Sequence, residues 1–148
     1  MNLPTYNVEL KSEEPYSFEF FSEGKNGKIQ KLIIYQEIEE NFFNLAFGDK
    51  DLKTGKLNDK SISDNGDTEK ILATVVLTIY LFTKRNPYAY VFASGSTPAR
   101  NRLYRRSITK YLAQAQEDFK IYGMLFDEKT EVFTPNKDYK AFIIQRKI

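Results

Sequence analysis

The segment from Ile71 to Phe82, "ILATVVLTIYLF", constrains the fold most strongly, because it is apolar on almost every side. Asp67 precedes it and is a good helix N-cap, and Pro87 follows it and ends a helix. Its β-branched residues also suit a strand, but its length and both end signals predict a helix over about residues 67–85. A helix that is apolar all round is usually buried. We therefore expect a central helix on which the rest of the chain packs.

The residues before this helix have the patterns of β-strands. We expect strands at Tyr6–Leu10, on both sides of the Asn26-Gly27 turn, and at Asn41–Phe47. Asn-Gly is a favoured two-residue hairpin turn because both residues tolerate positive φ. A turn at this place would pair Phe20 with Ile33. Both faces of the hairpin are partly apolar, which indicates that it lies inside a larger sheet.

The residues after the central helix read as a strand, a second helix and two further strands. Tyr88–Ser94 is the strand, and Thr97 and Pro98 are a typical start for a helix over residues 98–119. The apolar stripe of this second helix is Tyr104, Ile108, Tyr111, Leu112, Ala115 and Phe119. Gly123 marks the exit from the helix. Two closing strands are expected in "MLFDEKTEVF" and "YKAFIIQRK".

These elements predict one α+β domain over residues 1–148, because strand-rich and helical segments are largely separated along the chain. The expected order is β-β-β-β-α-β-α-β-β. It gives a mostly antiparallel sheet of about five to seven strands with two main helices. Residues 48–66 are polar without a clear period and form a long loop within the domain. This loop is a functional flap or locally disordered, and it also suits a short strand pair about Thr54-Gly55.

Absent residue types exclude several kinds of chemistry. The chain has no Cys and no His, so it has no thiolate nucleophile, no cysteine zinc site and no Ser-His-Asp triad. "GSTPAR" lacks the lysine of a phosphate-binding P-loop. The segment Asp49–Lys60 has lysines where a calcium loop needs ligands. We therefore expect no cofactor and no metal.

The location expected for the chain is the cytoplasm. The first residues lack the basic and apolar segments of a secretory signal. The longest apolar run, at residues 71–82, is too short for a membrane span, which needs roughly 20 residues. No contact with a membrane is expected.

Charge is segregated along the chain. Residues 71–116 contain no carboxylate and seven basic side chains, whereas the remainder carries a net charge of −5, which together give +2. Such separation favours a basic surface that meets an anionic partner.

The second helix is charged against its own dipole. A helix N-terminus carries roughly half a positive charge and favours acids, yet this helix begins with arginines and ends with Glu117 and Asp118. A bound anion would offset that cost, since the first amides of a helix bind phosphate. The candidate anion-binding residues are Gly95, Ser96, Thr97, Arg100, Arg102, Arg105, Arg106 and Lys110.

Helical spacing separates these basic residues. Arg102, Arg106 and Lys110 share one ridge away from the apolar stripe, Arg105 flanks it, and Arg100 lies nearer the stripe. Arg100 is therefore expected to point into a cleft. Two other interpretations remain open: the ridge is a solvated face, or the chain's own acids pair with it. Arg100 also suits a structural salt bridge.

Three functions are compatible with these features. The favoured one is a non-enzymatic binding domain whose basic helix recognises an anionic partner, first nucleic acid and second an acidic protein. An alternative is a His-free ribonuclease or nucleotide-acting toxin-like enzyme at the "GSTPAR" turn, which would use Arg100, Arg102, Tyr104 and Lys110. The other alternative is a protein-interaction module of a toxin–antitoxin-type pair, whose edge strands pair with a partner.

Several sequence blocks in combination resemble a known family. They are "FSEGKNGKIQKLIIY", "FNLAFGDKD", "DNGDTEKILATVV", "ASGSTPARNRLYRRSI" and "YKAFIIQRK". They are similar to a family of small uncharacterised bacterial proteins, a domain of unknown function typical of Bacteroides- and Flavobacterium-type bacteria. The resemblance covers about residues 18–147. It implies a single-domain cytoplasmic protein and supplies no activity, cofactor or catalytic residue.

Overall fold

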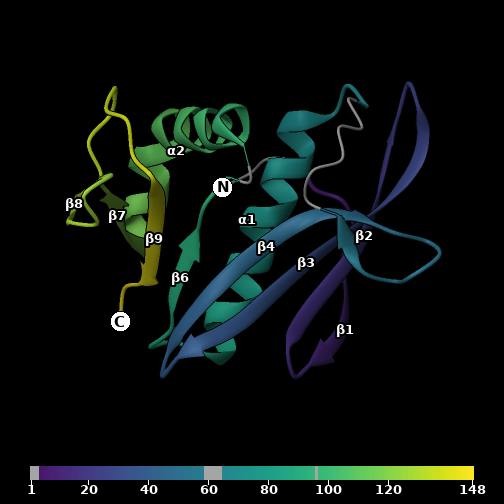
Figure 1. The fold of residues 1–148 in the computed structure, drawn as a ribbon, viewed down its shortest axis with the longest axis horizontal. Helices are drawn as coiled ribbons and strands as arrows, with labels where there is room; N and C mark the ends of the chain where they lie inside the picture. Colours follow the sequence, from purple (N-terminus) through teal and green to yellow (C-terminus); the bar gives the residue numbers. More distant parts are fainter. Residues whose placement is uncertain (1–3, 59–64, 96) are drawn as a thin grey trace.

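The computed structural model describes residues 4–58, 65–95 and 97–148, and over these it contains two helices and one sheet of nine strands (Figure 1). The helices are α1 (Thr68–Arg85) and α2 (Pro98–Asp118). The strands are β1 (Glu9–Glu13), β2 (Tyr16–Gly24), β3 (Gly27–Glu39), β4 (Phe42–Lys50), β5 (Leu57–Asn58), β6 (Tyr90–Ala93), β7 (Phe119–Met124), β8 (Thr130–Val132) and β9 (Ala141–Arg146). The α+β class and the two helices are as predicted.

The sheet is antiparallel except at one place. Its strand order is β1-β2-β3-β4-β6-β9-β7-β8, with β5 paired to the end of β4. The pair β4–β6 is parallel because α1 carries the chain across between the two strands. Figure 1 shows α1 passing behind β3 and β4, so this helix covers one face of the sheet. No helix in the described ranges is long and apolar enough to cross a membrane.

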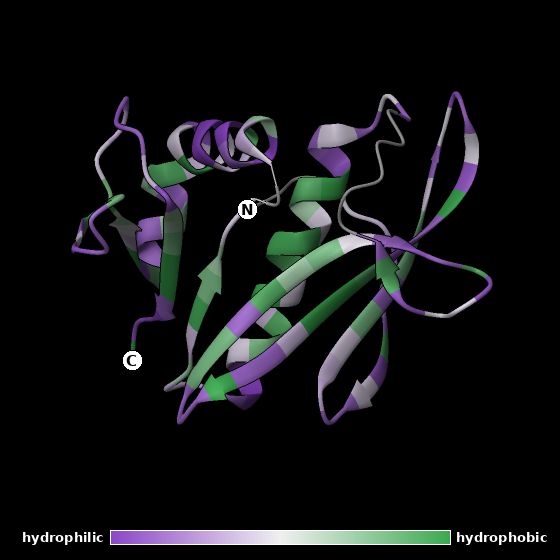
Figure 2. Ribbon diagram, viewed as in Figure 1, coloured by the Kyte–Doolittle hydropathy of each residue, from purple (hydrophilic) through white to green (hydrophobic). Residues whose placement is uncertain are grey.

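The core lies between α1 and the sheet face that it covers. Phe82 of α1 is fully buried, and its ring stacks on Tyr35 of β3 with centroids 4.2 Å apart. Tyr16 and Phe43 meet the same Phe82 ring edge-on. Burying one such side chain contributes about 1.5–3 kcal/mol. The prediction of a central buried helix is therefore confirmed, and Figure 2 shows its hydrophobic middle turns.

Buried threonines of α1 satisfy their hydroxyl groups within the fold. Thr74 and Thr78 donate to the carbonyl oxygens of Lys70 and Val75, both at 2.7 Å. The Thr78 hydroxyl also lies 2.8 Å from the hydroxyl of Tyr35. These bonds offset the cost of placing polar groups in an apolar helix.

The N-terminal strand begins later than predicted, because Tyr6 is bound to α1. The Tyr6 amide donates to Thr74 Oγ1 at 2.9 Å, and its hydroxyl donates to Asp67 Oδ2 at 2.5 Å. Burial, followed by the bond to Asp67, raises the pKa of Tyr6. Asp67 holds the N-cap position as expected, but its side chain makes no capping bond and also accepts a bond from Ser22 Oγ.

The hairpin between β2 and β3 turns one residue earlier than predicted. Residues 25–26 form the turn, and Gly27 follows with φ of 86°. Phe20 therefore pairs with Lys31 instead of Ile33. The predicted turn needs positive φ at both central residues, and here only the glycine provides it. The register shift is two residues, so every side chain keeps its predicted face.

The sheet has more strands than the expected five to seven. β4 runs on to Lys50, and β5 pairs with it across the Thr54-Gly55 turn, which confirms a strand pair within the 48–66 loop. Residues 59–64 of that loop lie outside the described residues. β7 follows α2 directly, so Gly123 lies inside a strand and does not mark the helix exit.

Position 123 requires a glycine because the ring of Tyr139 fills the space that a side chain would need. A Cβ atom at this position would lie 2.3 Å from Tyr139 Cε1. We predict that Gly123→Ala lowers the free energy of unfolding by about 1–3 kcal/mol, measured by urea denaturation. In a Tyr139→Leu background the same alanine should cost clearly less. An equal cost in both backgrounds would contradict this explanation.

Candidate anion-binding site

The junction between β6 and α2 folds as its sequence predicts. Thr97 is the N-cap, and its hydroxyl accepts a bond of 3.1 Å from the Arg100 amide. Pro98 opens the helix, where its missing amide hydrogen has no cost. Ser96, another candidate residue, lies outside the described residues.

Gly95 and Asn101 fasten the start of α2 to the sheet. The Gly95 amide donates to Asn101 Oδ1 at 3.1 Å, and Asn101 Nδ2 donates to the Tyr139 carbonyl at 2.6 Å. A Cβ on Gly95 would lie 2.4 Å from the Asn101 backbone nitrogen. The glycine is therefore required by close packing within the chain. The close approach to Gly95 that the sequence assigns to a ligand is made here by the Asn101 backbone.

Arg100 lies against the sheet. β6 pairs with β4 only as far as Leu45 and Ala93, and β4 continues beyond this point. There Arg100 Nη1 donates to the Phe47 carbonyl oxygen at 3.2 Å, and its guanidinium lies 5.7 Å from the centroid of the Phe47 ring. Arg100 thus covers the edge that β6 leaves open, and it lines neither of the two pockets described next.

The first pocket, which we call the helix-start pocket, has a volume of about 390 Å³. It is lined by Gly95, Thr97, Pro98, Asn101, Arg102, Arg105, Phe126, Asp138, Tyr139 and Lys140. Arg105 forms an ion pair with Asp138, and Lys140 pairs with Glu128 at 3.0 Å. Arg102 is exposed and makes no ion pair or hydrogen bond with any described residue.

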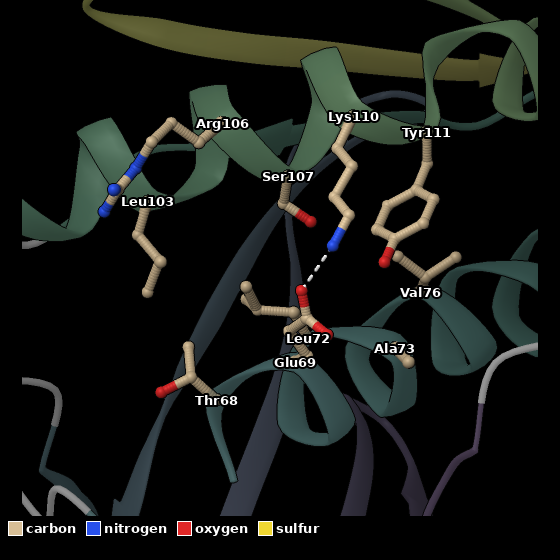
Figure 3. Close-up of a pocket in the computed structure, with 10 residues that line it drawn as sticks. All are labelled: Thr68, Glu69, Leu72, Ala73, Val76, Leu103, Arg106, Ser107, Lys110 and Tyr111. Atoms are coloured by element: carbon tan, nitrogen blue, oxygen red, sulfur yellow. Dashed lines mark hydrogen bonds and ion pairs between the residues drawn. The ribbon is translucent and has the colours of Figure 1, made fainter. Parts of the chain in front are cut away.

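The second pocket, which we call the interhelix pocket, lies between α1 and α2 and has a volume of about 280 Å³ (Figure 3). It is lined by Thr68, Glu69, Leu72, Ala73, Val76, Leu103, Arg106, Ser107, Lys110 and Tyr111. Lys110 and Glu69 form an ion pair of 2.5 Å across its mouth. The hydrogen bond to Glu69, followed by that to Tyr111, raises the pKa of Lys110.

Carboxylates of the chain itself therefore neutralise part of the basic surface of α2. Arg105 and Lys110 have carboxylate partners, whereas Arg106 is exposed and, like Arg102, has no ion pair or hydrogen bond within the described ranges. Figure 3 shows Arg106 extending toward the N-terminal end of α2, away from the Lys110–Glu69 pair. Arg102 borders one pocket and Arg106 the other. The predicted ridge thus runs between two pockets.

The two ends of α2 differ in how their charges are balanced. The first turn contains no acid and the last turn no base, as predicted. At the last turn, Tyr80 donates to Asp118 Oδ2 at 2.6 Å, and the Lys147 ammonium donates to the Gln116 carbonyl. The chain therefore stabilises the negative end of α2, whereas Arg102 and Arg106 in its N-terminal half have no acid partner among the described residues.

Other chemistry finds less support in this geometry. The residues of the enzyme alternative are not brought together, because Arg102 and Lys110 line different pockets and Arg100 lines neither. No group of three or more acids that could hold a metal ion occurs in the described part of the chain. Sequence reasoning missed Asn101, Asp138 and the role of Glu69 toward Lys110. No local pattern marks these contacts, since each joins segments far apart in sequence.

The chain matches a family of unknown function (DUF6934) over residues 2–147, and it belongs to this family. The match confirms the predicted resemblance to a domain of unknown function and covers nearly the whole chain. No curated protein and no solved structure matches. The geometry described above therefore carries the functional argument.

Arg100 and Arg102 should differ sharply in their effect on stability. We predict that Arg100→Ala lowers the free energy of unfolding by about 1–3 kcal/mol, because it removes a charged bond to a part-buried carbonyl. Arg102→Ala should change it by less than about 0.5 kcal/mol, as is usual at exposed sites. Urea denaturation of both variants measures this difference. Equal values would show that Arg100 has no structural role.

Proposed function

We propose that this protein binds nucleic acid through the outer surface of α2, with Arg102 and Arg106 as the central contacts. One observation carries the proposal: these two exposed arginines lie four residues apart on one face of α2, and neither has a carboxylate partner among the described residues. Lys110, the third residue of the ridge, and Arg105 beside it have carboxylate partners within the chain. Two like charges four residues apart on a helix repel each other in the free protein, and a bound anion offsets this repulsion.

The spacing of the two arginines suits a polyanion. Residues four apart on a helix lie about 6 Å apart along its axis and share one face. Arg102 and Arg106 can therefore contact neighbouring phosphates of one strand. Guanidinium groups bind phosphate oxygens through two parallel hydrogen bonds, which makes arginine well suited to this contact. The proposal needs no catalytic step and takes the protein to act in the cytoplasm of a bacterium, as its sequence suggests.

An acidic protein surface is the second partner that such a helix would accept. Nucleic acid is favoured because the 46 residues from Ile71 to Gln116 contain no carboxylate at all, which suits a long and uniformly charged partner. The test therefore has to measure the response to phosphate contacts and not binding alone.

We predict that the purified protein binds a fluorescein-labelled 12-nucleotide RNA in an anisotropy titration, with affinity that falls steeply as salt rises. Each phosphate contact on a single strand contributes about −0.7 to the slope of log K against log salt. Arg102→Ala/Arg106→Ala should therefore weaken binding and flatten this slope by about 1.4.

The matched control is Lys53→Ala/Lys56→Ala, which removes the same charge from exposed residues between β4 and β5. This control should keep most of the affinity and the slope. The proposal fails if no salt-sensitive binding is found, or if both double variants lose affinity equally.

A further inference from the structure

From the shape and lining of the interhelix pocket we infer that it receives one unpaired base, so that the nucleic acid recognised by α2 is single-stranded. This inference rests on the proposed function and adds the class of nucleic acid. Its starting point is that the pocket borders Arg106 directly, which has no ion pair within the described ranges, whereas the helix-start pocket borders Arg102. A strand that lies along the arginines passes the mouth of the interhelix pocket.

The walls of the pocket suit a flat apolar group. Leu72 and Val76 of α1 line one side of the pocket, and Leu103 and Tyr111 of α2 line the opposite side (Figure 3). Bases that leave a stack are held by aromatic and apolar side chains of this kind. The volume of about 280 Å³ lies just below the usual range of small-molecule pockets, which begins near 300 Å³. The pocket therefore has room for one base.

The rim of the pocket carries groups that can bind the edge of a base and its phosphate. Ser107 and Thr68 offer hydroxyl groups, which both donate and accept hydrogen bonds. Glu69 and Lys110 bridge the mouth, but their side chains are 73% and 58% exposed, so the pair is weak and can open. Arg106 extends from the rim toward the N-terminal end of α2 (Figure 3), where it would contact the phosphate of the same nucleotide. The charge of the rim thus complements a nucleotide.

Helix α2 is kinked beside the interhelix pocket. Tyr111 has φ of −111° and ψ of 15°, which is not helical, and α2 kinks there. No proline or glycine lies within α2 after Pro98 to cause the kink. The Tyr111 side chain lines the interhelix pocket, and the Lys110 ammonium lies 5.3 Å from its ring centroid. The kink therefore coincides with the ring that would contact the base.

A duplex does not offer a base to this pocket. Its bases are paired and stacked, and removing one from the stack costs several kcal/mol. A duplex still offers phosphates, at a higher charge density than a single strand. A preference for the single strand therefore cannot come from charge alone, and it reports on the pocket.

The experiment compares three probes of equal length by anisotropy: a 12-nucleotide single-stranded RNA, its blunt duplex, and a 12-unit strand of abasic sites. We expect the wild-type protein to bind the single strand roughly tenfold more tightly than the abasic strand, as for the contact of one base. We also expect it to prefer the single strand to the duplex. These comparisons use the unaltered protein and do not depend on the folding of a variant.

A pocket-filling variant gives the second arm. Leu103→Trp should fill the pocket without changing charge, and it should abolish the preference for the single strand while duplex binding stays the same. Gln114→Trp, on an exposed part of α2 outside the interhelix pocket, is the matched control and should behave as wild type.

The outcomes separate the two proposals. If the three probes bind equally and Arg102→Ala/Arg106→Ala still weakens them, the pocket inference is wrong and the proposed function stands. If no probe binds in a salt-sensitive way, both are wrong.

Discussion

The stack of Phe82 on Tyr35 is the contact on which the rest of the structure depends. It holds α1 against the middle of the sheet, and the rings of Tyr16 and Phe43 enclose the same Phe82 side chain. Helix α2 packs on the same core through Ile108 and Ala115. The interhelix pocket lies between α1 and α2, with Thr68, Glu69 and Leu72 from the start of α1 in its lining. The candidate site is thus a consequence of how the core is built.

The arginines in the first half of α2 fall into two groups: one is structural and the other is exposed to solvent. Arg100 is used inside the fold, where it completes the edge of β4, and Asn101 joins Gly95 to Tyr139. The next turn then presents Arg102 and Arg106 to solvent. Because Arg100 is bound to β4, the exposed arginines on the same helix keep a fixed position relative to the sheet. Preorganisation of this kind lowers the entropy lost when a charged partner binds.

The sequence predicted the elements whose signals are local. The apolar length and the capping residues of α1, and the Thr97-Pro98 start of α2, correspond directly to the structure. Contacts between distant segments were not predictable. Tyr6 bonds to Thr74 of α1 and to Glu23 of β2 without forming a strand, and the ring of Tyr139 leaves no room for a side chain at Gly123. The same limit applies to the site. Helical spacing identified the ridge of α2. It could not show that Phe47, Asp138 and Glu69 bind three basic side chains of this helix.

The most direct measurement of the central claim is an amide chemical-shift titration of the ¹⁵N-labelled protein with the 12-nucleotide RNA. The account predicts that the largest shifts fall on Arg102, Leu103, Arg106 and Ser107 of α2 and on the first turns of α1 across the interhelix pocket. Phe42, Tyr90 and Phe92 lie on the sheet face away from α1 and should not respond. Shifts concentrated on these aromatic residues, with α2 unchanged, would contradict the assignment of the basic helix as the binding surface.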